Sequence, residues 1–436
     1  MKVKIVGAGL AGSEAALQLA KRGIEVDLYE MRPLKMTGAH TTEKLAEFVC
    51  SNSMGSYDVS VASGLLKKEM ELLDSELIKV AFDVKVPAGN ALAIDREEFS
   101  KRVTELIEAN PLINLVREEV DEIPDGNVII ASGPLTSDNM AKSIQEFTQE
   151  EHLHFFDAVA PIVEKDSINF DKAFYGSRYD KGEASYINCP MNKEEYENFY
   201  NILINAERIE LKEFEKNAKF FESCLPVEVL GSRGVDTLRF GPMKPVGLVD
   251  KRTNEINYAV VQLRQDNALK TLYNLVGFQT NLKWSFQKEL IHSIPGLENA
   301  NIVRYGVMHR NTFINSPRIL TNKLNTKKRD NLFFAGQITG VEGYTESMAS
   351  GLIAGINMAK YIKGEQMLEM PSECILGALL NYITDENHKQ LQPVNSNWAL
   401  INNIELPKKI RKDKKAKAEI LANRSLEALS GVLNTL

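Results

Sequence analysis

The chain has 436 residues, of which 44% are hydrophobic and 25% are charged, and its formal net charge is −7. This length predicts two domains with substantial apolar cores and excludes a disordered chain. No stretch reaches the roughly 18 uncharged apolar residues of a membrane span, and the first apolar run lacks the features of a secretory signal. We therefore expect a cytoplasmic protein without membrane contact, in which an RNA partner would meet a local basic patch.

The first thirty residues predict a strand, a tight turn, a helix and a second strand. Residues 2–6 form an apolar run typical of a buried parallel strand, and residues 13–23 carry apolar side chains at helical spacing. Residues 24–29 alternate apolar and polar side chains and end at Glu30. This order predicts a compact βαβ unit.

A GxGxxG pattern fills the turn of this unit. Its glycines allow a tight turn, a close approach of a pyrophosphate and close helix packing, while the helix N-terminus favours phosphate charge. We expect Glu30 to accept hydrogen bonds from ribose hydroxyls and to repel a 2′-phosphate, which favours FAD or NAD over NADP. The alternative for Glu30 is an exposed strand-end carboxylate. The turn consists of Gly7, Ala8, Gly9, Leu10, Ala11 and Gly12.

The rest of the chain predicts an α/β fold, a Rossmann-type, glutathione-reductase-like FAD-binding domain with an inserted α+β domain. A loop is expected over residues 31–60, helices over 61–80 and 94–110, and a strand at 127–134. Short strands and polar helices over 151–285 indicate the inserted domain. Residues 286–436 then return to the FAD-binding domain that begins with residues 1–150. In this return part, FFAGQITG and a small-residue helix over 347–362 predict a second backbone contact with the cofactor, at Gly336 and Gly340, which suits a bound flavin.

The four cysteines are too few and too dispersed for a disulfide framework, and no zinc spacing is present, so we expect no structural metal. Cys50, in the polar segment EFVCSNSMGS, is a candidate nucleophile, although a lone cysteine is often inert. Cys224 precedes a proline, close to Arg233 and Arg239. These arginines could favour a thiolate or contact phosphate, and the alternative for Cys224 is a buried structural thiol. The remaining two, Cys189 and Cys374, are interpreted as structural.

Two further polar features have more than one interpretation. His309, Arg310, Asn311 and Asn315 interrupt an apolar run and form either a structural network or part of a ligand site. The C-terminal tail carries eight basic and two acidic residues between positions 408 and 424, in contrast to the acidic whole. Such a run is either a solvated helix face or an RNA contact. Its first basic residues are Lys408, Lys409 and Arg411.

Many specific blocks, in one order and over nearly the whole chain, resemble the bacterial folate- and FAD-dependent tRNA (uracil-5-)-methyltransferases, the TrmFO family. The blocks include GAGLAGSEAALQLAKRG, YEMRP, EFVCSNS, PAGNALAIDR, SRYDKGEASYINCPM, CLPVEV, FGPMKPVGL, GFQTNLKW, YGVMHRNTFINSP and FFAGQITGVEGY. The resemblance implies methyl transfer to carbon 5 of uridine 54 in the tRNA T-loop, with 5,10-methylenetetrahydrofolate as carbon donor. It also implies that reduced FAD carries the methylene and supplies the reducing equivalent, and that NADH or NADPH regenerates the reduced flavin.

The family's functional thiols fall on Cys50 and Cys224, and a family tyrosine near the flavin falls on Tyr344. A thiolate that adds to C6 of uracil turns C5 into a nucleophile, and we assign this addition to Cys224. Cys50 would protect or activate the flavin-bound methylene, or remove the C5 proton. Tyr344 would stack on the flavin or serve in packing.

The RNA target leaves alternatives open. After CSNS the chain reads MGSYDVSVASG, a segment that varies among relatives, and some members of the family act on ribosomal RNA. A flavin oxidoreductase of a small molecule and a non-catalytic RNA-binding flavoprotein are the other readings. For RNA phosphates the candidates are Arg233, Arg239 and the basic tail residues.

Overall fold

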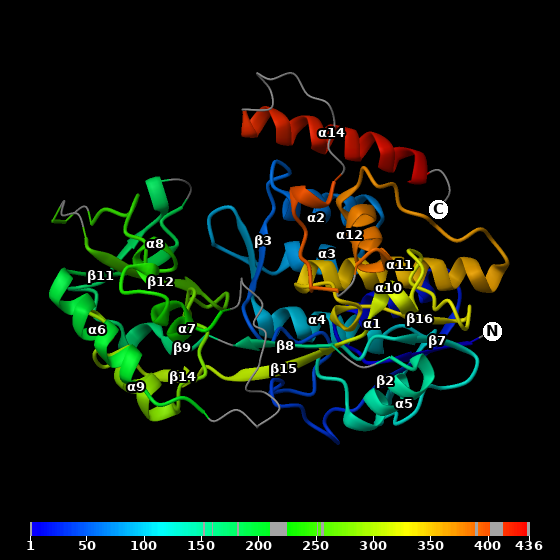
Figure 1. Ribbon diagram of the computed structural model, residues 1–436, viewed down its shortest axis with the longest axis horizontal. Helices are drawn as coiled ribbons and strands as arrows, with labels where there is room; N and C mark the ends of the chain where they lie inside the picture. Colours follow the sequence, from blue (N-terminus) through cyan, green and yellow to red (C-terminus); the bar gives the residue numbers. More distant parts are fainter. Residues whose placement is uncertain are drawn as a thin grey trace.

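The computed structural model describes residues 2–150, 153–158, 160–180, 183–209, 225–250, 252–253, 257–388, 391–401 and 413–433, with only the backbone at 153–158, 309–310 and 414. Two lobes lie side by side in Figure 1, a larger one that contains both ends of the chain and a smaller one drawn mainly in green. Each lobe has its own hydrophobic core, and we refer to the two lobes as the larger and the smaller domain.

The larger domain is built on a parallel sheet with the βαβ unit at its centre. Every neighbouring pair of strands is parallel, and Ile5 and Ile129 in the middle of the sheet are fully buried. The last strand in the chain, which follows the second domain, lies at one edge of the sheet, two positions from the first strand. The order is β16 (Leu332–Phe334), β7 (Asn127–Ile130), β1 (Lys2–Val6), β2 (Glu25–Glu30) and β6 (Ile113–Arg117).

Helix α1 (Leu10–Lys21) packs between this sheet and helix α11 (Tyr344–Lys363). The two helices approach closely because α11 has glycines where it crosses α1. A Cβ atom at Gly351 would lie 2.2 Å from the carbonyl oxygen of Ala11, and one at Gly355 would lie 2.8 Å from that of Ala15. The small-residue helix expected over 347–362 is therefore present, and it braces the helix that follows the glycine turn.

A small antiparallel sheet and three helices complete this side of the larger domain. The helix expected over 61–80 is two helices, because the chain turns at Asp74, which has a left-handed backbone with φ of 64°. The loop expected over 31–60 is free of regular structure except for one short strand. The elements are β3 (Ser53–Ser56), β5 (Ala91–Ile94), β4 (Lys85–Val86), α2 (Ala62–Leu72), α3 (Glu76–Asp83) and α4 (Arg96–Glu108), and α5 (Asp138–Thr148) follows β7.

The smaller domain is a six-stranded antiparallel sheet with helices packed on it. It extends past residue 285, where we expected it to end, because β14 pairs with β9. We therefore move this boundary to about residue 307. The sequence pattern around residue 285 does not indicate this boundary, because the pairing of β14 with β9 joins segments that lie far apart in the chain. The sheet order is β10 (Phe174–Gly176), β11 (Tyr186–Met191), β12 (Ala259–Gln265), β13 (Leu272–Leu275), β9 (Ile162–Glu164) and β14 (Ile302–Arg304), and the helices are α6 (Lys193–Asn205), α7 (Val227–Ser232), α8 (Thr237–Phe240) and α9 (Trp284–His292).

The chain enters and leaves the smaller domain through one antiparallel ribbon. Strand β8 (Leu153–Ala158) pairs with β15 (Met308–Phe313) along its full length, and the ribbon crosses the middle of Figure 1. The polar island at His309 and Arg310 lies in β15, where the structure describes only their backbone. Asn311, the next residue, is buried.

Besides α11, the described C-terminal part contains the helices α10 (Ser316–Ile319), α12 (Ile375–Thr384) and α14 (Lys414–Leu433). Helix α14 lies across the top of the larger domain in Figure 1 and packs on α2. Glu69 of α2 joins these elements, because its carboxylate accepts hydrogen bonds from the amides of Ile375 and Leu376 and from the hydroxyl of Ser425. Within the described ranges, no helix combines the length and apolar character needed to cross a membrane.

Candidate functional site: a dinucleotide cleft with a cysteine loop at one end

The glycine turn connects β1 to α1, and at Gly7 and Gly12 it packs so closely on other backbone atoms that a larger side chain would clash. Gly7 has φ of 98°, and a Cβ atom there would lie 2.6 Å from the carbonyl oxygen of Ala131. A Cβ atom at Gly12 would lie 1.8 Å from the carbonyl oxygen of Gly7, whereas one at Gly9 would meet no protein atom within 4 Å. Gly9 is thus open toward the cleft, at the N-cap of a helix with no acidic residue in its first turn. This geometry suits a pyrophosphate.

A cleft runs along this turn, and the space between its walls, open solvent included, is about 1050 Å³. It extends from Glu118 and Glu119 past the glycine turn to Gln337 and Ser347. Seven of the residues expected to bind the cofactor line it, namely Gly7, Gly9, Leu10, Ala11, Glu30, Gly336 and Tyr344.

The other three expected cofactor residues occupy different places. Ala8 and Gly12 belong to the glycine turn but do not line the cleft. Gly340 has φ of 89°, and a Cβ atom there would lie 2.7 Å from Leu391, so the structure gives this glycine a packing reason. Gly336 also fits tightly, with a Cβ atom 2.9 Å from that of Ala11.

Glu30 is buried and bonded to the glycine turn, which excludes the alternative of an exposed carboxylate. Its Oε2 accepts a hydrogen bond from the amide of Ala8 at 3.2 Å, and its Oε1 accepts from Nε of Arg32 at 2.9 Å. Burial acts to raise the pKa of Glu30, but the hydrogen bonds and charge of Arg32 outweigh it and hold that pKa below its ordinary value. A ribose hydroxyl that binds Glu30 would share these oxygens with the protein.

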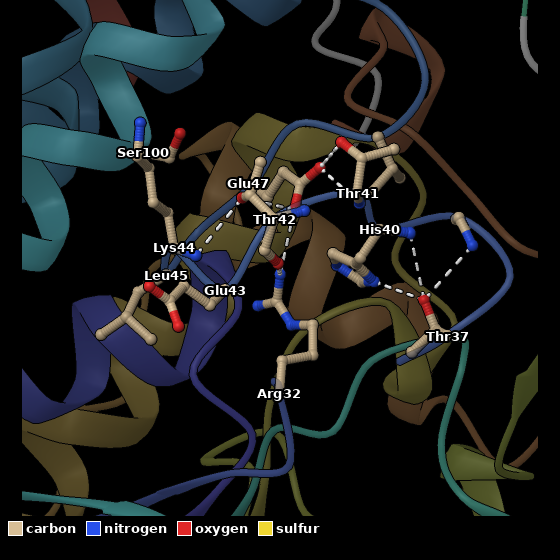
Figure 2. A network of polar contacts seen from close by, with 12 residues as sticks. Arg32, Thr37, His40, Thr41, Thr42, Glu43, Lys44, Leu45, Glu47 and Ser100 are labelled. Carbon is tan, nitrogen blue, oxygen red and sulfur yellow. Dashed lines mark hydrogen bonds and ion pairs between the residues drawn. The ribbon is translucent and has the colours of Figure 1, made fainter. Parts of the chain in front are cut away.

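Arg32 extends this network to the loop above the cleft (Figure 2). Its side chain is 1% exposed, and Nη1 donates to Glu47 at 3.1 Å and to the carbonyl of Thr42 at 3.1 Å. Glu47 also accepts hydrogen bonds from the amides and hydroxyls of Thr41 and Thr42. Burial acts to raise the pKa of Glu47, but the Thr41 hydrogen bonds and other neighbours bring it below its ordinary value. Arg32 thus lies between the carboxylates of Glu30 and Glu47 and ties the loop segment 41–47 to the end of β2.

Cys50 lies on the continuation of this loop and is tied to the cleft by Tyr344. The amide of Cys50 donates to the hydroxyl oxygen of Tyr344 at 2.7 Å, and the amide of Ser51 donates to the same oxygen at 3.2 Å. The ring of Tyr344 packs on Phe48 with centroids 4.1 Å apart. Because Tyr344 lines the cleft, the half-buried Cys50 is held beside its end.

Comparison with known proteins decides what kind of protein this is. A family model described as "Glucose inhibited division protein A" matches residues 2–366. A curated relative from Anoxybacillus flavithermus, named "Methylenetetrahydrofolate--tRNA-(uracil-5-)-methyltransferase TrmFO", is 57% identical over 436 residues and covers 100% of both chains. One of the same name from Bacillus cytotoxicus is 57% identical over 432 residues, 99% of each chain. This chain belongs to the TrmFO family.

Solved structures agree with this assignment at the level of the fold. Aquifex aeolicus GidA superposes with a TM-score of 0.67 over 99% of this chain and 76% of that chain, at 17% identity. A second crystal form of GidA gives the same TM-score at 18% identity, over 98% of this chain and 76% of that chain. The expected Rossmann-type flavoprotein fold with its parallel sheet is thereby confirmed.

Several residues expected to be functional in this TrmFO family member lie away from the cleft or outside the described residues. Cys224 and the tail residues Lys408, Lys409 and Arg411 are in the latter group. Arg233 is exposed at the C-terminal end of α7. Arg239 is half-buried; it pairs with Asp236 at 2.6 Å and lies 3.4 Å over the ring of Tyr258. This engagement gives Arg239 a structural role within its own domain.

The other cysteines have the surroundings of structural thiols. Cys189 and Cys374 are fully buried, and burial raises the pKa of both, that of Cys374 to about 12. In the described part of the chain, no group of three or more histidine, cysteine or acidic residues could hold a metal ion.

Sequence reasoning missed Arg32, although a signal was present. An arginine two residues beyond the strand-end Glu30 can fold back on it, and this spacing was visible in YEMRP. It also missed Arg96, Arg264 and Arg304, which come from three different elements and contact residues 48–52 around Cys50. No local pattern marks these three arginines, because each reaches the loop from a distant part of the chain.

Proposed function

We propose that this chain forms 5-methyluridine at uridine 54 in the T-loop of tRNA, with the carbon taken from 5,10-methylenetetrahydrofolate. FAD, reduced by NADH or NADPH, would supply the methylene carrier and the reducing equivalent. The names of relatives that are 57% identical over the whole chain support the reaction and the tRNA substrate. The cleft supports the cofactor, because its glycine turn accommodates a pyrophosphate and its far end is bounded by Tyr344.

The observation that carries the proposal is the bond between the Cys50 amide and the Tyr344 hydroxyl. It places a loop with a candidate catalytic thiol against a residue of the cleft wall. A reaction that needs both a dinucleotide cofactor and a thiol beside it therefore fits this geometry.

The two thiols divide the chemistry of the uracil ring in this proposal. C5 of uracil is a weak nucleophile until a thiolate adds to C6 and pushes an electron pair toward C5. We assign the addition to Cys224. The segment that carries it leaves at Ile209 and returns at Val227, whose amides donate to the neighbouring carbonyls of Asn281 and Gln279. Cys50 would remove the C5 proton as a base or protect the carried methylene.

The RNA must present a base that normally stacks inside a folded loop. We propose that uridine 54 turns outward to reach the thiols, at the cost of a few kcal/mol of lost stacking. Phosphate contacts would hold the RNA in register. The exposed Arg233 and the basic tail residues Lys408, Lys409 and Arg411 are the proposed contacts.

The decisive experiment incubates the purified protein with 5,10-methylenetetrahydrofolate, NADH and unmodified tRNA, followed by nucleoside analysis. We expect 5-methyluridine at position 54, none in a tRNA with cytidine at that position, and none from Cys50→Ala or Cys224→Ala. A parallel reaction with ribosomal RNA tests the substrate, and product only there would change the RNA but keep the chemistry. Rapid NADH oxidation without any methylated nucleoside would replace the proposal with a small-molecule oxidoreductase.

A further inference from the structure

The cysteine loop, residues 48–52, lies where the two domains meet, and the smaller domain holds it by two arginines. Arg264 of β12 donates from Nη2 to the hydroxyl of Ser51 at 2.6 Å and from Nε to Oδ1 of Asn52 at 3.0 Å. Arg304 of β14 donates from Nη2 to the carbonyl of Val49 at 2.9 Å. The residues on both sides of Cys50 are therefore bonded to guanidinium groups.

A third arginine approaches the same loop from the larger domain. Arg96, the first residue of α4, is 9% exposed, and its Nη1 lies 3.5 Å from the carbonyl oxygen of Phe48. Its Nη2 contacts both carboxylate oxygens of Asp266 at 2.6 Å, and its Nε donates to Oδ2 at 3.2 Å. Asp266 belongs to the smaller domain, just after β12, so the Arg96–Asp266 pair joins the two domains beside the cysteine loop.

Neutral side chains close this arrangement into one network. Asn274 of β13 donates to Asp266 at 3.0 Å and to Asn52 at 3.1 Å. Asn52 in turn donates to the carbonyls of Ile94 and Gln265. The network fixes the backbone after Cys50 from both domains at once.

The charges around the loop are predominantly positive. Three guanidinium groups touch it, and Asp266 is the carboxylate bonded to Arg96. Arg264 and Arg304 donate to neutral groups here, the Ser51 hydroxyl, the Asn52 amide oxygen and backbone carbonyls. Burial lowers the pKa of Arg264 and of Arg304, and the charge of Arg96 lowers both further. The three cations therefore act on one another, and an anion among them would be stabilised.

Other ionisable groups face the loop from the remaining elements. Tyr344 comes from α11, Glu47 directly precedes the loop, and Tyr186 comes from β11. Burial acts to lower the pKa of Arg96, but the charge and hydrogen bonds of Asp266 raise it above its ordinary value, with smaller contributions from Tyr344 and Cys50. Arg96 and the thiol of Cys50 are thus within electrostatic reach of each other.

We propose that Arg96 is a positioning residue that stabilises the thiolate of Cys50, and that Asp266 of the smaller domain moderates this effect by pairing with Arg96. Thiolates are the reactive form of cysteine and form more readily beside cations. The inference rests on the proposed function for what the thiolate does, but its formation is a property of the folded protein without RNA or folate. Domain contact would thereby set the reactivity of the thiol.

The pair offers two substitutions that should act in opposite directions. Arg96→Gln removes a positive charge and leaves Asp266 near the loop, so the pH at which Cys50 ionises should rise, by about one unit. Asp266→Asn leaves the charge of Arg96 without its carboxylate, so that pH should fall. Arg96→Lys keeps the charge and should stay near wild type. A merely structural role would not produce shifts of opposite sign.

The experiment measures the rate of alkylation of Cys50 by iodoacetamide from pH 5 to 10 in the full-length, FAD-bound protein. Residues 45–67 form a tryptic peptide in which Cys50 is the only cysteine, so mass spectrometry follows this thiol alone. FAD content and the thermal midpoint of each variant establish that it is folded. If Arg96→Gln fails to fold, the other two variants still test the proposal. A lower pH midpoint of Cys50 alkylation in Asp266→Asn, with no change of that pH midpoint in Arg96→Lys, supports it.

The inference would be overturned if the pH midpoint of Cys50 alkylation shifted in the same direction in Arg96→Gln and Asp266→Asn. It would also be overturned if that pH midpoint were unchanged in Asp266→Asn. The assay contains neither RNA nor folate, so its outcome is independent of methyl transfer. A protein that makes no 5-methyluridine but shows the opposite shifts would refute the proposed function and keep the role of Arg96.

Discussion

Tyr344 accepts the amide hydrogen of Cys50 at 2.7 Å, although 294 positions separate the two residues in the chain. Tyr344 is the first residue of α11, and α11 packs through its glycines on α1, the helix that follows the glycine turn. One path of direct contacts therefore runs from the pyrophosphate end of the cleft to the cysteine loop. Changes at either end of this path should be felt at the other.

Tyr344→Phe should impair methyl transfer while FAD remains bound. The change leaves the amides of Cys50 and Ser51 without their acceptor, at a cost of about 1–3 kcal/mol per buried group. The loop would lose its position beside the cleft, and each roughly 1.4 kcal/mol added to the barrier lowers the rate about tenfold. Single-turnover rates and FAD content are the measurements. Tyr361→Phe, in the same helix but away from the loop, is the matched control; equal rates in both variants would contradict the argument.

The parts of this site that could be predicted from the sequence depend on neighbours in the chain. The glycine turn and Glu30 belong to one βαβ unit, so strand, turn and helix patterns were enough to find them. Arg96, Arg264 and Arg304 could not be found in this way, because they meet at the cysteine loop only after the two domains pack together. The boundary at residue 285 failed for the same reason.

Two glycines of the turn should respond differently to alanine. At Gly12 a Cβ atom would lie 1.8 Å from the carbonyl of Gly7, so Gly12→Ala should lower the stability of the protein itself, by at least 1–3 kcal/mol as is usual for overpacking. At Gly9 a Cβ atom would meet no protein atom, so Gly9→Ala should leave the stability of the FAD-free protein unchanged and weaken FAD binding. Thermal midpoints and FAD titrations separate the two effects.

Gly431→Ala provides a control for this pair of variants. It lies in α14, where a Cβ atom would also meet nothing, so alanine there should leave FAD binding unchanged and raise stability by roughly 0.5–1 kcal/mol. A Gly9→Ala protein that binds FAD like wild type would show that the pyrophosphate does not approach this position.

Arg32→Met should destabilise the loop above the cleft in a pH-dependent way. The change leaves Glu30 and Glu47 buried without their cation, at a cost of about 3–5 kcal/mol near neutral pH. In the wild type both carboxyls have lowered pKa values, so their contribution is present above the ordinary carboxyl pKa and is lost as pH falls through the folded values. In Arg32→Met the carboxyls become easier to protonate.

The difference in thermal midpoint between wild type and Arg32→Met should therefore be largest near pH 7 and shrink toward pH 4. Glu47→Gln, which removes one of the two carboxylates, should retain most of the stability at neutral pH. A difference that is constant over this pH range would mean that packing, and not charge, explains the role of Arg32.

Glu69 should make the protein less stable as pH rises from about 4.5 to about 7. Burial raises its pKa to about 7, despite hydrogen bonds from Ser425, Leu376 and Ile375. Because the folded pKa lies above the ordinary value of 4.5, the contribution is full below pH 4.5 and is lost as pH rises to about 7, by up to roughly 3 kcal/mol. The thermal midpoint of Glu69→Gln should vary less between pH 5 and pH 8. Glu373→Gln, which changes a half-buried partner of Arg424, should keep the wild-type pH dependence between pH 5 and pH 8.

The smaller domain is an insertion, called the cassette below, whose two ends lie side by side because β8 pairs with β15. Ala158 and Met308 are opposite each other in the ribbon, so a short turn between them could replace the intervening residues and close a β-hairpin. The shortened chain would keep every strand of the parallel sheet, including β16, which comes after the cassette in sequence. It would also lose Arg264, Asp266 and Arg304 together. Arg96 would remain beside the cysteine loop, now without its partner Asp266, so the second domain supplies both additional cations to the loop and the carboxylate that pairs with the first one.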